Sequence, residues 1–260
     1  PLLPSLEASA AFRVDKYRGG ETATTPKVGL KWTPADWVAL RATYAEGFRA
    51  PNPAEAGDGG LAGFSTTRDP LRCPGGTPVP GATAADCAVN LAIITTPNPD
   101  LQPEESKSYT VGVVLDPTPT TTLTFDVWQI KRSNEINQGD SDLALAAGRG
   151  VRGDNDLPGI PGSGTLLAVS VDYSNSAATT VRGFDFDINQ RVDMGSYGNL
   201  DMDLQWTRIN TFERDDGSGA VFEYAGTHGN CDVTNCIGTP KDRINLGVTW
   251  ELERFSASAV

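Results

Sequence analysis

The sequence of 260 residues lacks long apolar runs, a basic stripe and clusters of histidine. No run of about 18 apolar residues occurs, which excludes a transmembrane helix. The net charge of −12 is unsuited to nucleic acid, which requires a basic surface. The single histidine, and the lack of nucleophile-elbow, phosphate-loop, dinucleotide and HExxH motifs, argue against an enzyme and against a resident cofactor or metal.

Cysteine is scarce and falls into two local pairs. Cys73 and Cys87, like Cys231 and Cys236, lie in loop-like sequence that contains glycine or proline. Two local pairs predict two disulfides and an oxidising compartment. A metal site is the alternative, but the spacing of Cys231 and Cys236 differs from that of a zinc knuckle. We therefore favour the disulfides.

The sequence also lacks a start. It begins at Pro1, its first methionine is Met194, and no signal peptide precedes the first strand-like segment. Its last residues, from Phe255 to Val260, begin another alternating segment. We therefore expect a fragment of a longer chain.

What the sequence has in abundance is alternation of apolar and polar residues. In the segment 106–116, Tyr109 and Val111 alternate with Ser108 and Thr110, as in a strand with one apolar face. The other segments of this kind are 6–15, 26–33, 37–49, 121–132, 179–191, 199–210 and 241–252, with a ninth starting at Phe255 and a short strand possible at 167–172. The pattern predicts an all-β, antiparallel meander of about eight strands and part of a ninth.

The connections between these segments alternate in length. Short turns are expected at 34–36, 117–119, 194–198 and 253–254, a moderate loop at 16–25, and long connections at 50–105, 133–178 and 211–240. A meander puts all the short turns at one end, which is typical of a transmembrane β-barrel with short periplasmic turns and long extracellular loops. Trp32, Trp37 and Trp250 fall at the short-turn end, where they suit an interfacial girdle or, alternatively, the bottom of a packed core.

Two segments resemble the barrel of TonB-dependent outer-membrane receptors. The first is PKVGLKWTP at 26–34 followed by LRATYAEGFRAP at 40–51, and the second is NPDLQPEESKSYTVG at 98–112. VRGFD at 181–185 is a weaker match. The resemblance implies a barrel of about 22 strands, the plugged size class. Residues 1–260 would then form one partial barrel domain, with the plug domain and the terminal strands not present.

The same resemblance implies a place and a function. The protein would lie in the bacterial outer membrane, in contact with its lipid, with the plug domain of the full-length chain and, through the missing N-terminal part, with the TonB complex. It would take up a scarce small-molecule nutrient, for which a ferric siderophore is our first choice. Uptake of oligosaccharide, cobalamin or haem by the same mechanism stays open. So does a non-transporting surface β protein that binds glycans through its loops.

Two sets of polar residues are candidates for contacts. Those on the polar faces of the strands should line the lumen and face the plug: Arg41, Asp185, Asp187, Asp201, Asp203 and Arg243. Paired aspartates could alternatively bind a cation or do acid–base work, a reading that we favour less. In the long connections, where binding residues concentrate, the expected ligand contacts are Arg49, Arg68, Arg72, Asn134, Arg152, Tyr224 and His228.

Overall fold

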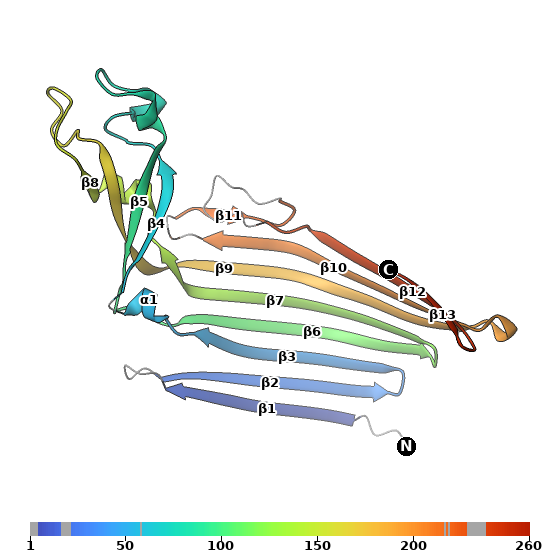
Figure 1. Cartoon of the computed structure of the whole chain (residues 1–260). Helices are drawn as coiled ribbons and strands as arrows, with labels where there is room; N and C mark the ends of the chain where they lie inside the picture. Colours follow the sequence, from blue (N-terminus) through green and yellow to red (C-terminus); the bar gives the residue numbers. More distant parts are fainter. Residues whose placement is uncertain (1–4, 17–21, 58, 216, 218, 228–237) are drawn as a thin grey trace. The chain divides into compact units, whose positions relative to one another are not determined.

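The computed structural model describes residues 5–16, 22–57, 59–215, 217, 219–227 and 238–260. Within them, nine strands form one sheet path in the order β1-β2-β3-β6-β7-β9-β10-β12-β13 (Figure 1). Their bounds are β1 Ser5–Lys16, β2 Thr22–Ala35, β3 Val38–Arg49, β6 Glu104–Thr118, β7 Thr121–Gln138, β9 Leu166–Asp193, β10 Asn199–Asp215, β12 Asp242–Leu252 and β13 Phe255–Ala259. The predicted all-β antiparallel meander is confirmed, and the sheet is open, with β1 and β13 at its edges.

Turns of two lengths connect these strands, as the sequence predicted. β2 and β3 meet at Asp36–Trp37, β6 and β7 at Pro119–Thr120, and β12 and β13 at Glu253–Arg254. β9 and β10 are joined through the short 3-10 turn η3, Gly195–Tyr197. The connections that follow β3, β7 and β10 are long and leave the sheet at its other end. The segregation of loop lengths is therefore a property of the fold.

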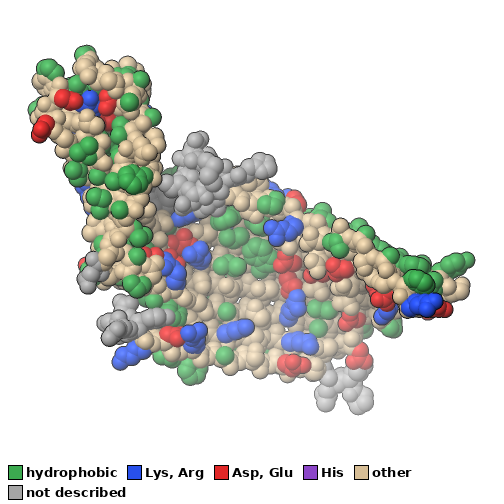
Figure 2. Space-filling model, viewed as in Figure 1, with side chains coloured by type: hydrophobic (Ala, Val, Ile, Leu, Met, Phe, Trp, Pro, Cys, Tyr) green, Lys and Arg blue, Asp and Glu red, His purple; other side chains and the backbone are tan. Residues whose placement is uncertain are grey.

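One face of this sheet is apolar and exposed. Phe12, Val28 and Val111 have exposed fractions of 77%, 49% and 62%. Rings line up along the same face: the centroids of Tyr44 and Tyr109 are 4.9 Å apart, and the further contacts are Phe125 with Phe184 and Phe184 with Trp206. Because alternate side chains of a strand point to opposite faces, Arg41, Asp126 and Asp187 lie together on the other face. Figure 2 shows charged side chains among the others over the sheet.

The chain divides into two compact units. Residues 1–49, 105–133 and 177–260 form the unit that we call the sheet unit, and residues 50–104 and 134–176 form the unit that we call the loop module. The loop module holds α1 Pro53–Ala56, β4 Leu61–Thr67, the 3-10 turns η1 Pro74–Gly76 and η2 Ala84–Cys87, β5 Val89–Thr96, α2 Ser141–Ala146 and β8 Gly150–Arg152. A further short strand, β11 Val221–Glu223, pairs with β10.

The loop module is more regular than its sequence suggested. β4, β5, β8 and the first part of β9 form a small mixed sheet, in which β5 and β9 run parallel. The sequence predicted a short strand near 167–172 separate from a strand at 179–191, but one strand, β9, covers both. Within the described residues, no helix is long and apolar enough to cross a membrane.

Candidate functional site

A disulfide frames the first half of the loop module. Cys73 and Cys87 are bonded, as predicted, and Cys73 is fully buried. The bond joins η1 to η2, and η2 is held at its start by Thr83 and Asp86, whose side chain and backbone form a capping box. Cys231 and Cys236 lie outside the described residues, so the second predicted pair stays a prediction.

Two arginines, the buried Arg72 and the partly buried Arg152, hold the halves of the loop module together. Arg152 of β8 donates to both carboxylate oxygens of Asp69, with distances of 2.7 Å. Arg72 donates 2.8 Å to Asp86 and 2.7 Å to the Ser163 carbonyl, and also pairs with Asp156. Breaking a buried ion pair of this kind costs about 3–5 kcal/mol, because the remaining charge stays buried. These contacts therefore fasten residues 134–176 to residues 50–104.

The carboxylates in this frame stay ionised. Burial disfavours the charged form of Asp69, but hydrogen bonds from Arg152 and from the backbone N–H groups of Leu71 and Arg72 outweigh it, so the pKa of Asp69 lies below its ordinary value. Asp86 behaves alike: burial opposes ionisation, while donors from Thr83 and Arg72 lower its pKa. Both aspartates are therefore negatively charged partners at neutral pH.

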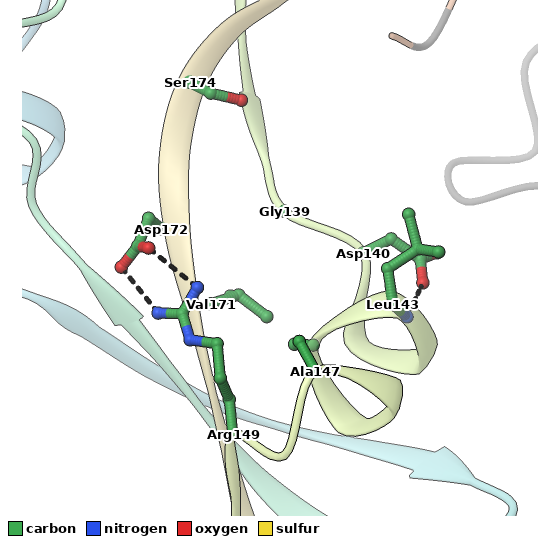
Figure 3. A pocket seen from close by; sticks show the side chains of 9 residues that line it. Gly139, Asp140, Leu143, Ala147, Arg149, Val171, Asp172 and Ser174 are labelled. Atoms are coloured by element: carbon green, nitrogen blue, oxygen red, sulfur yellow. Dashed lines mark hydrogen bonds and ion pairs between the residues drawn. The ribbon is translucent and has the colours of Figure 1, made fainter. Parts of the chain in front are cut away.

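A pocket of about 330 Å³ opens in the second half of the loop module (Figure 3). Its floor is apolar and includes Val171, which is 1% exposed, and Ala144. α2 forms one wall of the pocket. The Asp140 side chain accepts from the Leu143 N–H at 2.8 Å and so caps the start of that helix. The remaining lining residues are Gly139, Leu143, Ala147, Arg149, Asp172 and Ser174.

The charged part of the pocket is an ion pair. Figure 3 shows Arg149 reaching across to both oxygens of Asp172, at 2.8 Å and 2.7 Å. Gly148, with a φ of 78°, turns the chain after α2 and delivers Arg149 to this place. The Arg149 hydrogen bond lowers the pKa of Asp172, and burial offsets only part of that effect. Both side chains are partly exposed. The Arg149 guanidinium is therefore accessible to an anion that replaces Asp172 as its partner.

The polar face of the sheet unit has its own ion pair. Arg41 of β3 donates 2.9 Å to Asp126 of β7, with a second contact between the same two groups. β6 runs between these strands, and its Gly112 lies directly opposite Asp126. A Cβ at Gly112 would fall 1.9 Å from Asp126 Oδ1. The ion pair therefore crosses β6 over a glycine that leaves room for it.

Other charged residues of this face have partners of their own. Asp185 accepts from the Thr207 hydroxyl at 2.7 Å, and Thr207 lies opposite Arg243 in the β10–β12 register. Arg191 approaches Asp201 at 3.4 Å. Within the described residues, no group of three or more His, Cys, Asp or Glu side chains could hold a metal ion.

Comparison with protein families decides what this sheet is. A family model described as "TonB dependent receptor-like, beta-barrel" matches residues 1–260. The chain belongs to the TonB-dependent receptor β-barrel family. The barrels of this family are transmembrane proteins of the bacterial outer membrane, so the short turns of the sheet unit are periplasmic and its long connections are extracellular. The exposed apolar face is the lipid-facing side of the barrel wall, and the polar face is the lumen side.

Solved structures with the same fold include siderophore receptors. The siderophore receptor PirA from Acinetobacter baumannii matches with a TM-score of 0.61 at 14% identity, over 96% of this chain and 29% of that one. A mutant of the ferric enterobactin receptor PfeA from Pseudomonas aeruginosa matches with a TM-score of 0.60 at 15% identity, over 97% and 29%. A double mutant of the Serratia marcescens hemophore receptor HasR, in complex with its hemophore HasA and heme, has a TM-score of 0.50 at 14% identity, over 98% and 38%.

These likenesses show the fold of the barrel wall. The chain spans about 29% of the length of the two siderophore receptors. No curated protein sequence matches the chain. The identity of the cargo therefore has to be argued from the residues of this chain.

The predicted ligand contacts fall into different environments. Arg49, at the end of β3, and Arg68, just after β4, are exposed. Arg72 and Arg152 lie in the ion pairs described above, which favours a structural role over the ligand contact predicted for them. The backbone carbonyl of Asn134 accepts from the Asn175 side chain at 2.8 Å. Tyr224 is 3% exposed and its ring lies beside that of Phe212. His228 lies outside the described residues.

The sequence did not point to the pocket. Asp140 before the apolar run 143–147 is a helix start signal, but it was part of a segment interpreted as a loop. Asp172 was expected to lie in a short strand, and nothing in the local sequence connects it to Arg149 across 23 residues. The pocket depends on the pairing of the strands of the small sheet, which the local sequence does not show.

Proposed function

We propose that this barrel belongs to an outer-membrane receptor that takes up a ferric siderophore by TonB-dependent active transport. One observation carries the proposal: the extracellular connections fold into an ordered module with its own pocket, whereas the periplasmic connections are turns of a few residues. A rigid scaffold that carries elaborated loops at one end is the usual arrangement of a binding protein. The siderophore receptors among the structural neighbours support this cargo class.

The pocket chemistry fits an anionic chelate with apolar or aromatic parts. The half-exposed Arg149 guanidinium can form paired hydrogen bonds to carboxylate or catecholate oxygens, and the floor formed by Val171, Ala144 and Ala147 can accept a ring. Arg49, Arg68 and Asn134 stay predicted contacts in the same extracellular region. The barrel supplies the wall and the capture site, and in this proposal it performs no catalysis.

The lumen residues have a proposed partner as well. Asp185, Asp187, Asp201, Asp203 and Arg243 lie on strands of the sheet unit and, by alternation, on its polar face. We propose that they face the plug domain of the full-length chain, which in turn contacts the TonB complex. In this proposal they stabilise the docked plug and do not bind cargo.

Uptake by the full-length receptor tests the transport proposal. Cells that carry only this receptor should accumulate radiolabelled iron from a catecholate siderophore under iron limitation, and should stop when TonB is deleted. Arg149→Gln should raise the half-saturating concentration about tenfold, as expected for a lost charge-assisted hydrogen bond. Arg254→Gln, at the periplasmic turn, is the matched control and should leave uptake unchanged.

The outcome with other nutrients decides between the alternatives. Growth on oligosaccharide, cobalamin or haem with no response to iron would remove the siderophore from the proposal and leave the transport mechanism. Binding of a glycan to the receptor without any TonB-dependent accumulation would remove transport itself.

A further inference from the structure

The ion pair between Arg149 and Asp172 occupies the group on which anion binding in the pocket depends. Among the described residues that line the pocket, Arg149 alone is basic. Asp172 already accepts from it with both carboxylate oxygens, at 2.8 Å and 2.7 Å (Figure 3). A guanidinium binds a planar anion with two oxygens through two parallel hydrogen bonds. The carboxylate of Asp172 therefore lies where an anionic group of the cargo would bind.

This ion pair is open to solvent, whereas the backbone on both sides of it is fixed. The side chains of Arg149 and Asp172 are 38% and 49% exposed. The Arg149 N–H donates to the Ala144 carbonyl at 2.9 Å, and the Asp172 carbonyl accepts from the Gly139 N–H at 2.9 Å. An ion pair this exposed stabilises a fold only slightly. The two side chains can therefore separate at little cost, without a movement of the backbone that carries them.

Asp172 has a second partner on the neighbouring strand. Thr96 of β5 and Asp172 of β9 are register partners in the parallel pair of strands. A hydrogen bond from the Thr96 side chain contributes to lowering the pKa of the Asp172 carboxyl. A carboxylate displaced from Arg149 would therefore keep a partner at the edge of the pocket, and would stay close enough to bind the guanidinium again.

A carboxylate or catecholate of the cargo can replace Asp172 like for like. It supplies negative charge and two acceptor oxygens, so the Arg149 guanidinium keeps both hydrogen bonds during the exchange. A neutral group offers weaker acceptors than a carboxylate and would leave the ion pair closed. The other carboxylate of the lining, Asp140, is occupied as the cap of α2. The exchange therefore involves Asp172, Arg149 and one anionic group of the cargo.

We propose that Asp172 is an internal competitor of the cargo for Arg149, which lowers the affinity of the pocket for anions and takes the guanidinium back when the cargo leaves. A site that passes its cargo on must bind strongly enough to capture and weakly enough to release. A built-in competitor meets both needs, because neither capture nor release leaves the cation without a partner. The proposal deepens the proposed function and rests on its choice of this pocket as the capture site.

Binding of two matched probes to the full-length receptor tests the exchange. Benzoate carries the planar anion, and benzamide has nearly the same shape without the charge. Both are titrated by isothermal calorimetry against the purified receptor in non-ionic detergent at neutral pH. Asp172→Asn should bind benzoate about fivefold more tightly, the size of an exposed ion pair, and should bind benzamide as the wild type does. Arg149→Gln should remove the preference for benzoate.

Two controls separate competition from a general change of charge. Asp154→Asn removes the same charge from an exposed position of the loop module outside the pocket lining, and should leave both affinities unchanged. In the Arg149→Gln background, Asp172→Asn should no longer strengthen benzoate binding. A gain of the same size in that background or in Asp154→Asn would show that Asp172 only repels anions, and would overturn the proposal. Wild-type benzoate affinity in Asp172→Asn, or no benzoate binding to either form, would overturn it as well.

Two further measurements separate the possible failures. Heat-modifiable electrophoretic mobility shows whether each variant forms a folded barrel, and if Asp172→Asn does not, Asp172→Ser also lacks the carboxylate and should show the same gain. Siderophore uptake is measured on the same variants. A fivefold gain in a receptor that transports no siderophore would support the exchange and count against the transport proposal alone. Unchanged benzoate affinity in a receptor that transports siderophore would count against the exchange alone.

Discussion

Gly112 is a single residue on which a cross-strand ion pair depends. An added Cβ would meet Asp126 Oδ1 at 1.9 Å and the Phe125 carbonyl oxygen at 2.9 Å. We expect Gly112→Ala to displace the Asp126 carboxylate from Arg41 and to lower the free energy of unfolding by about 1–3 kcal/mol, because the added methyl group overpacks the site and the buried Asp126 loses its contact with the half-exposed Arg41. Urea unfolding of the receptor in detergent micelles measures this change.

Gly247 of β12 is the matched control for that substitution. A Cβ there would have its nearest neighbours at 3.8 Å and 3.9 Å, which is ordinary contact. Gly247→Ala should therefore change the free energy of unfolding by no more than about 0.5 kcal/mol. Equal destabilisation by the two substitutions would show that the ion pair is not what Gly112 protects.

Asp69 is the residue whose loss should loosen the loop module most. It is fully buried, and both of its carboxylate oxygens accept hydrogen bonds from Arg152. Asp69→Asn leaves the guanidinium of Arg152 without its counter-charge, and we expect the module to lose about 3–5 kcal/mol of stability. Trypsin cleavage at Arg68, which is exposed, should accelerate accordingly. Asp100→Asn, at an exposed position, should leave the cleavage rate unchanged.

The aspartates of the loop module also predict a pH dependence. The pKa values of Asp69, Asp86 and Asp172 lie below the ordinary value of 3.8, so the unfolded chain binds protons more readily than the folded module. Their stabilisation is complete above the unfolded pKa and is lost as the pH falls through the folded values. Hydrogen exchange of residues 50–104 and 134–176, corrected for intrinsic rate, should stay constant from pH 7 to about 5 and rise below about 4. A rise above pH 5 would implicate other groups.

At the scale of elements, the disulfide is the covalent fastening of the loop module. Cys73 and Cys87 are 14 residues apart, and closing a loop of that size stabilises a fold by about 3 kcal/mol through the unfolded state. We expect the double variant Cys73→Ser/Cys87→Ser to expose residues 50–104 to protease, while the barrel keeps its heat-modifiable mobility. If the barrel itself failed to fold, the module and the wall would not be independent units.

At the scale of the whole molecule, the alternation of loop lengths predicts which residues face the cell exterior. Asn155 lies in a long connection and is exposed, whereas Thr120 lies in the turn between β6 and β7. In intact cells, an impermeant maleimide should label Asn155→Cys and leave Thr120→Cys unlabelled until the outer membrane is permeabilised. The receptor without an introduced cysteine sets the background. Labelling of Thr120→Cys in intact cells would reverse the orientation that we assign to the barrel.

The strands and the direction of their faces could be predicted from the sequence alone. The side-chain period of a strand is two residues, so the spacing of Tyr109 and Val111 is enough to place both on the apolar face. Turn and loop lengths are equally local, because they are distances along the chain. The order of strands in the wall followed from these two properties, since a meander pairs neighbours in sequence, and the observed order β1-β2-β3-β6-β7-β9-β10-β12-β13 departs from it only where loop strands intervene.

Only the tertiary structure decided what the long connections build. Asp69 meets Arg152 across 83 residues, and Arg72 meets Asp156 across 84. β5 pairs in parallel with β9, which no turn between adjacent strands can produce. The pairing of Lys107 with Lys131 likewise depends on the register of two strands, so both charges are visible in the sequence but their pairing is not. Contacts between distant residues are selected by the packing of the whole chain, whereas alternation and turn length are set by neighbours.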